Sequence, residues 1–130
     1  MGLILDTNFI VAAEREARRG VTETIDRFFA GRANESFHIT FTIAGELACG
    51  QSASPKKDWA KLCQPYPVLP WCKEVSWQYG EIYRMLASKG QLIGANDMWI
   101  AATARVHGMG VVTRNVDEFL RVPGLEVVSY

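Results

Sequence analysis

The chain of 130 residues has the length of one ordinary domain, and its composition of 48% hydrophobic and 22% charged residues excludes an extensively disordered protein. Fourteen basic side chains balance fourteen acidic ones, so no net charge attracts the protein to nucleic acid or to an anionic membrane. A polyanion would have to bind at a local basic patch.

The first half of the chain predicts short strands that alternate with helices. In chain order the predicted elements are a strand at residues 3–5, helices at about 8–18 and 22–30, a strand at 37–40 and a helix that starts at 42. The first strand is an aliphatic run of the kind that is buried on both faces. Gly20, Gly31 and Gly50 follow the three helices as stop signals.

The second half continues the alternation. It predicts a helix opened by Pro55, a short edge strand around 68–69, the longest helix at about 73–89, a helix within 94–108, a strand at 110–113, one helical turn at 115–120 and a strand at 125–129. Prolines bracket the edge strand, and Asn96 is placed to cap the helix that follows the longest one.

This order of elements predicts an α/β fold. Short aliphatic strands separated by helices form parallel sheets with right-handed crossovers, here one three-layer α/β/α domain over residues 1–130. Such sheets carry their functional groups at the carboxyl ends of the strands. Asp6 ends the first strand, and residues 113–117 follow a later one.

Two patterns that the sequence lacks indicate the cellular compartment. No apolar run reaches the ~18 residues of a membrane span, and the N-terminus lacks the pattern of a secretory signal, so we expect a cytoplasmic protein without a membrane partner. Cys49, Cys63 and Cys72 fit neither a disulfide framework nor a zinc site, and we interpret them as reduced thiols.

Three carboxylates stand alone in apolar surroundings. Asp6 is the one charged side chain of residues 1–13, Glu46 of 36–55 and Asp97 of 90–104. Asp6 and Asp97 each have a structural explanation at a helix start, where a carboxylate binds free N–H groups. Glu46 lies within a helix with no cation four residues away, so a structural role would require a buried arginine from elsewhere.

Taken together, the three acids indicate a metal site. Carboxylates gathered at one edge of a sheet repel one another unless a divalent cation neutralises them, and oxygen ligands without histidine or cysteine suit Mg²⁺ or Mn²⁺. Such a cluster can activate a water for in-line attack on a phosphodiester. We therefore predict nuclease chemistry.

Residues 113–119, with the sequence TRNVDEF, supply a fourth group of candidates. Asp117 could reach the metal directly or through water, and Thr113 and Asn115 could bond the other carboxylates. Arg114 could hold a phosphate. The alternative for Asp117 and Glu118 is a solvated face of a short helix.

With these residues identified, the chain resembles a PIN domain of the VapC toxin type. The matching motifs are LILDTNFI, AGEL, GANDMWIAATA and VVTRNVDEFLRVPGLEV, in the order of that family and over the whole length. The resemblance implies a parallel five-stranded sheet, Mg²⁺- or Mn²⁺-dependent endoribonuclease activity on RNA, a homodimer, and a small antitoxin that covers the active groove. It also implies that Asp6, Glu46 and Asp97 form the acidic triad and ligate the metal, with Asn8 in a supporting position.

The chain departs from many PIN domains at the fourth acidic position, where Asn115 stands and the next carboxylate is Asp117. This departure keeps open a second hypothesis, a PIN-fold module that binds RNA or a protein partner without cutting. A dehalogenase-type phosphotransferase is disfavoured, because Asn8 stands where that class needs a second aspartate. Basic side chains that could line an RNA groove are Arg15, Arg18, Arg19, Lys56, Lys57 and Lys61.

Overall fold

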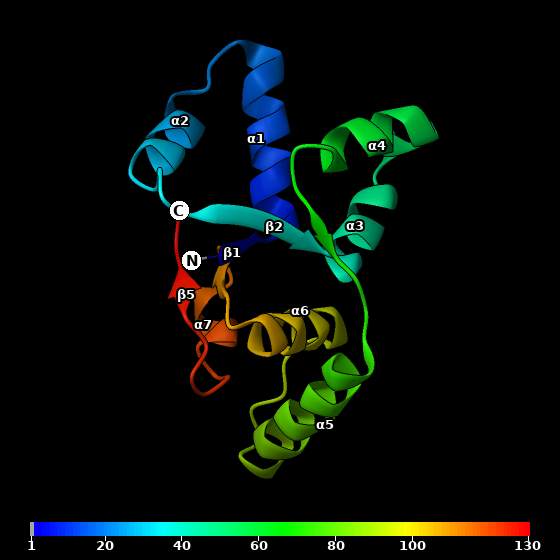
Figure 1. The fold of residues 1–130 in the computed structure, drawn as a ribbon, viewed down its shortest axis with the longest axis vertical. Coiled ribbons are helices and arrows are strands. Elements are labelled where there is room, and N and C mark those ends of the chain that lie inside the picture. The colour runs from blue at the N-terminus through cyan, green and yellow to red at the C-terminus, as the bar shows by residue number, and fades with distance from the viewer. Residues whose placement is uncertain (1) are drawn as a thin grey trace.

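The structure, a computed structural model, describes residues 2–130 and contains a five-stranded parallel sheet with helices on both sides (Figure 1). The strand order is β3-β2-β1-β4-β5. The strands are β1 (Gly2–Leu5), β2 (Ser36–Thr40), β3 (Val68–Leu69), β4 (Gly110–Val112) and β5 (Val127–Val128). The predicted three-layer α/β fold is confirmed.

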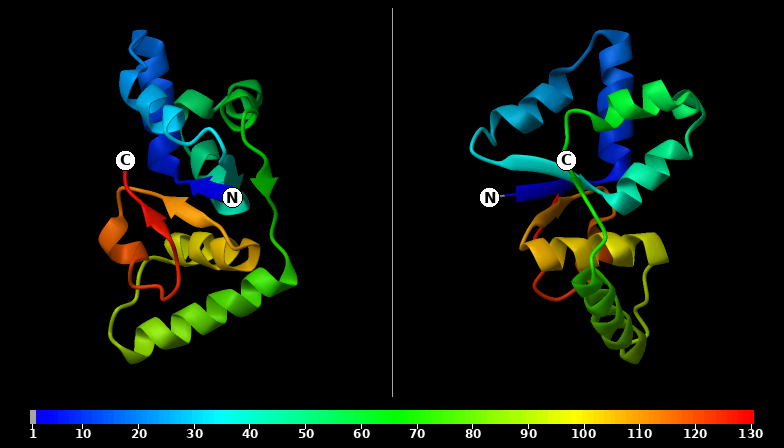
Figure 2. Two further views of the ribbon diagram at one scale, coloured as in Figure 1. Left: turned by 60° about the vertical axis from the view of Figure 1, so that its left-hand side comes forward. Right: turned by 45° about the vertical axis from the view of Figure 1, so that its right-hand side comes forward.

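The helices divide between the two faces of the sheet. They are α1 (Thr7–Arg19), α2 (Glu23–Ala30), α3 (Phe41–Ala48), α4 (Lys56–Cys63), α5 (Lys73–Ser88), α6 (Ala95–His107) and α7 (Val116–Phe119). Helices α1 and α2 lie on one side of the sheet and α5 and α6 on the other (Figures 1 and 2). Among residues 2–130, no helix has the length and apolar character that crossing a bilayer requires.

The central strand β1 determines where Asp6 lies. Leu3, Ile4 and Leu5 are at most 2% exposed, because β2 and β4 flank the strand and helices cover both faces. The ladder continues one residue further, since the Asp6 N–H donates to the Val112 carbonyl at 3.0 Å. Asp6 therefore stands in the middle of the carboxyl edge of the sheet.

An aromatic cluster joins α1, α2 and the end of β5. The Phe9 ring, which is 0% exposed, packs on Phe28 and Tyr130 with centroids 5.0 Å away in each case, and on Phe29 at 5.7 Å. Edge-to-face and tilted contacts of this kind are favourable beyond the area they bury. The cluster fixes Tyr130 beside the start of α1.

Two local predictions differ from the structure. The prediction that Asn96 caps its helix is wrong: Gly94 is the N-cap residue of α6, and the Asn96 side chain bonds to another element. The last strand is shorter than residues 125–129, because Leu125 still belongs to a turn closed on Val122. The three cysteines are free, as predicted.

Candidate active site

Asp6 combines a structural and a chemical role. It is the N-cap residue of α1, where Oδ1 accepts the Thr7 N–H at 2.8 Å. Its other oxygen, Oδ2, accepts the Thr113 hydroxyl at 2.8 Å. Burial raises the pKa of Asp6 from its ordinary value of 3.8; the bonds from Thr113 and Thr7 oppose this rise, and the charge of Glu46 adds to it. The carboxylate is thus buried with donors but without a cation.

Thr113 ties the end of β4 to Asp6. Its side chain is fully buried, and its oxygen also accepts the Asn115 N–H at 3.0 Å. The predicted bond from Thr113 to a carboxylate is present. For Asn115, the contact is made by the backbone, while its side chain is exposed.

Glu46 projects from α3 and is half-buried, less deeply than its apolar sequence neighbours suggest. Its Oε1 accepts the Thr7 hydroxyl at 2.6 Å and its Oε2 accepts the Asn96 amide at 3.3 Å. The ion pairs found within the described chain involve other acids, so the buried-arginine explanation of Glu46 receives no support. Neither Thr7 nor Asn96 was assigned to the site from the sequence.

Asp97 lies in the first turn of α6 and shows the strongest electrostatic effect. Burial, followed by the charge of Asp6, raises the pKa of Asp97 from 3.8 to about 7. The charge of Glu118, its hydrogen bond with Asp97 and then the charge of Glu46 contribute to the same rise. Four carboxyl groups therefore lie close enough to influence one another.

Of the two acids on α7, Glu118 is the one that interacts with Asp97. Both residues are on α7, but Asp117 is exposed; it borders one surface hollow with Lys89 and Arg121 and a second with Arg114 and Glu118. Glu118 is half-buried and interacts with Asp97. A helix of four residues is too short for its apolar period to show which of two adjacent acids points inward.

The carboxylates approach one another without converging. Within residues 2–130, no three acidic, histidine or cysteine side chains are arranged tightly enough to hold an ion. The donor set nevertheless fits a hard cation, because it consists of carboxylate oxygens; burial, and after it their mutual repulsion, raises the pKa of Asp6 and Asp97. Gathering them around one ion requires side-chain rotations.

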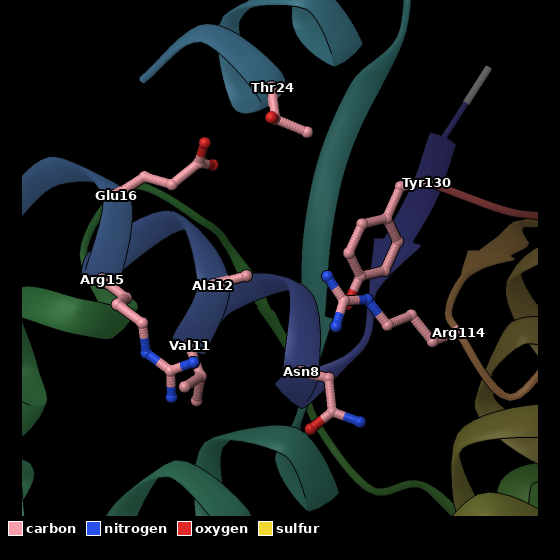
Figure 3. A pocket seen from close by; sticks show the side chains of 8 residues that line it. All are labelled: Asn8, Val11, Ala12, Arg15, Glu16, Thr24, Arg114 and Tyr130. Carbon is pink, nitrogen blue, oxygen red and sulfur yellow. The ribbon is translucent and has the colours of Figure 1, made fainter. Parts of the chain in front are cut away.

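Three of the predicted basic residues border two different hollows. Arg18 pairs with Glu14 at 2.6 Å, and both border a hollow with Lys61 and Asp58. The two basic side chains of this hollow therefore lie beside two acidic ones. Arg15 instead borders a pocket of about 310 Å³ together with Asn8 and Arg114 (Figure 3).

The model of the family described as PIN domain matches residues 3–125. The chain belongs to the PIN domain family. The protein named ribonuclease VapC1 from Rickettsia felis is 33% identical, with 99% of this chain and 96% of that protein covered. Ribonuclease VapC2 from the same organism is 30% identical over 94% of this chain and 92% of its own.

Solved structures agree with this PIN domain over its whole length. A chain in the crystal structure of VapBC2 from Rickettsia felis bound to a DNA fragment from their promoter superposes with a TM-score of 0.81 at 22% identity, covering 100% of this chain and 99% of that one. A chain of DNA-bound VapBC from Salmonella typhimurium gives a TM-score of 0.78 at 26% identity, covering 99% and 98%. The resemblance to VapC-type PIN domains inferred from the motifs is confirmed.

Proposed function

We propose that this PIN domain is a metal-dependent endoribonuclease that acts as the toxin of a toxin–antitoxin pair in the cytoplasm. The observation that carries the proposal is the gathering of Asp6, Glu46, Asp97 and Glu118 at the carboxyl edge of the sheet. There the other three carboxyl groups each raise the pKa of Asp97. The similar proteins named ribonuclease VapC, and the VapBC structures, support the same reaction and an antitoxin partner.

The cation would be Mg²⁺ or Mn²⁺, and Asp6, Glu46 and Asp97 would hold it. When bound, such an ion supplies a water of lowered pKa and stabilises the leaving oxygen of the phosphodiester. The protein contributes orientation, because Thr113 and Thr7 fix both oxygens of Asp6. Asp97, with its pKa near 7, has to give up its proton for the set to be fully ionised.

Three residues near the triad have supporting roles in this proposal. Glu118 takes the fourth acidic position that sequence reasoning gave to Asp117, because it is the acid that faces Asp97. Asn96 and Thr7 hold the Glu46 carboxylate from two different helices. Removing a donor to a metal-holding carboxylate typically costs 10- to 100-fold in metal affinity or activity.

We also propose that the protein forms a homodimer. Trp71 and Trp77 are 55% and 58% exposed, and Tyr83 on the same helix as Trp77 is 46% exposed. Large aromatic side chains on a surface are typical of protein interfaces. The balanced charge of the chain does not oppose self-association.

The second candidate function is a PIN domain that binds RNA or protein without cutting. The observations that favour it are the uncharged Asn115 and carboxylates that do not converge. Incubating the purified protein with structured RNAs in Mg²⁺, Mn²⁺ or EDTA separates the two. Cleavage that needs the cation and is lost in Asp6→Asn, with the fold retained, supports the nuclease; binding without cleavage at every cation concentration decides for the binding module.

A further inference from the structure

The pocket bordered by Arg15, Arg114 and Tyr130 is linked through the chain to the acidic cluster, which consists of Asp6, Glu46, Asp97 and Glu118. Asn8, which borders it, stands two residues after Asp6, and Arg114 follows Thr113, whose hydroxyl bonds to Asp6. Figure 3 shows Arg114 and Tyr130 on one side of the pocket and Arg15 on α1 at the other side. Two of the residues that border the pocket are therefore joined by short stretches of chain to Asp6 and to its hydrogen-bond partner.

Arg114 is held in place by aromatic rings. Its guanidinium carbon Cζ lies 5.0 Å from the Tyr130 ring centroid, and Tyr130 in turn packs on Phe9 with centroids 5.0 Å apart. The ion pairs found within residues 2–130 do not involve Arg114. Its N–H groups therefore remain available to an anion, and a planar guanidinium suits a phosphate.

A second arginine borders the same pocket without a carboxylate partner. Arg15 is exposed and takes part in no ion pair of the described chain, unlike Arg18 one turn further along α1, which pairs with Glu14. One carboxylate, Glu16, borders the pocket beside these two guanidinium groups. The pocket is thus cationic at a site that adjoins a cluster of acids.

Tyr130 provides an independent indication of a ligand. Its hydroxyl is buried and has no hydrogen-bond partner within residues 2–130. Buried hydroxyls are nearly always paired, so one that is not paired and borders a pocket is a candidate donor or acceptor for a bound molecule. Val11 and Ala12 add an apolar wall, and about 310 Å³ lies at the lower end of the volumes that hold small ligands.

We propose that this pocket is a subsite for one nucleotide of a single-stranded RNA, with its phosphate bound between Arg15 and Arg114 and its sugar or base against Val11 and Tyr130. This inference rests on the proposed function, because it takes RNA as the ligand. A protein segment is disfavoured as occupant, since two unpaired guanidinium groups next to a site for phosphodiester cleavage match the charge of a nucleic-acid strand.

The test measures binding without cleavage. The affinity of a fluorescein-labelled RNA hexanucleotide for the full chain is measured by anisotropy in EDTA over a series of salt concentrations. We expect Arg15→Ala to weaken binding by about 10-fold at low salt and to reduce the slope of log K against log salt by about 0.7, the value for one phosphate contact on a single strand. Arg27→Ala, which removes an exposed arginine paired with Glu23 on α2, is the matched control and leaves both quantities unchanged.

Two further measurements locate the contact. Replacing the linkages of the RNA one at a time with neutral methylphosphonate should weaken binding to the wild type at one linkage, and this effect should disappear in Arg15→Ala. Tyr130→Phe should lower RNA affinity without lowering the melting temperature, because the hydroxyl has no partner in the free protein.

The inference is overturned if Arg15→Ala binds RNA as the wild type does, if the methylphosphonate effect persists in that variant, or if the wild type binds no RNA at 50 mM salt or below. Loss of antitoxin binding alone in Arg15→Ala would show a protein-docking surface instead. Since no cleavage is measured, a protein that binds here but never cuts would refute the nuclease while leaving this subsite in place.

Discussion

The Thr113 hydroxyl donates a 2.8 Å hydrogen bond to Oδ2 of Asp6, across 107 positions of the sequence. Both residues are buried, and each directly follows one of the two neighbouring strands β1 and β4. A hydrogen bond to a charged, buried acceptor is among the stronger ones in proteins. This contact fixes the carboxylate around which the other acids are arranged.

Replacing Thr113 by valine tests this contact. The shape of the side chain is kept and the donor is lost, so we expect the free energy of unfolding to fall by about 1–3 kcal/mol and RNA cleavage to fall by about 10- to 100-fold. Denaturant unfolding and initial rates of cleavage measure the two effects. Thr103→Val is the matched control, because Thr103 is equally buried but bonds to the Trp99 carbonyl within α6; equal losses of cleavage in both variants would contradict a specific role for Thr113.

The raised pKa of Asp97 predicts how stability depends on pH. In the absence of a cation, the folded protein holds the Asp97 proton up to about pH 7, whereas the unfolded chain loses it near 3.8. Between these values the folded state binds more protons, so its stability falls as the pH rises from about 4 to 7. Thermal unfolding in EDTA should show this fall.

The variant Asp97→Asn removes the titrating group. We expect it to be more stable than the wild type at pH 8 in EDTA and to show a weaker dependence of stability on pH, although Asp6, whose pKa is also raised, contributes in the same direction. Added Mn²⁺ should flatten the wild-type curve, because the cation favours the ionised acids. A wild type that becomes more stable from pH 4 to 7 in EDTA would contradict the account.

Substitutions of the two acids of α7 should have different effects on RNA cleavage. Glu118→Gln removes the charge that faces Asp97, so we expect the pKa of Asp97 to fall and cleavage to drop by about 10-fold or more. Asp117→Asn changes an exposed carboxylate that borders Lys89 and Arg121, so cleavage should stay close to that of the wild type. Cleavage rates and an NMR titration of Asp97 check both. A larger loss in Asp117→Asn than in Glu118→Gln would reverse the assignment.

The aromatic cluster around Phe9 should matter for stability more than any exposed apolar residue. Phe9 is 0% exposed and contacts three rings, so Phe9→Ala should reduce the free energy of unfolding by about 3–5 kcal/mol. Leu120→Ala, at a residue that is 59% exposed, should change it by less than about 0.5 kcal/mol. Urea unfolding measures both, and a small effect of Phe9→Ala would show that α1 and α2 do not share this core.

The sequence was sufficient to predict the elements of the fold, because aliphatic runs such as residues 3–5 and glycine stops such as Gly20 act locally. It was also sufficient to predict the positions of Asp6 and Thr113, since the carboxyl ends of neighbouring parallel strands meet at one edge. The partners of Glu46 could not be predicted. Thr7 and Asn96 reach Glu46 from helices 39 and 50 positions away, and only the packing of α1, α3 and α6 decides which polar side chains meet.

The most direct test of the account is whether the acidic cluster binds a divalent cation. Mn²⁺ titrated by calorimetry into the metal-free protein at pH 7, in buffers of different ionisation enthalpy, should show binding with release of protons, because Asp97 is partly protonated before the ion enters. Asp6→Asn, with its fold verified by circular dichroism, should bind Mn²⁺ far more weakly. A wild-type protein that binds no Mn²⁺, or an Asp6→Asn variant that binds it equally well, would contradict the central claim.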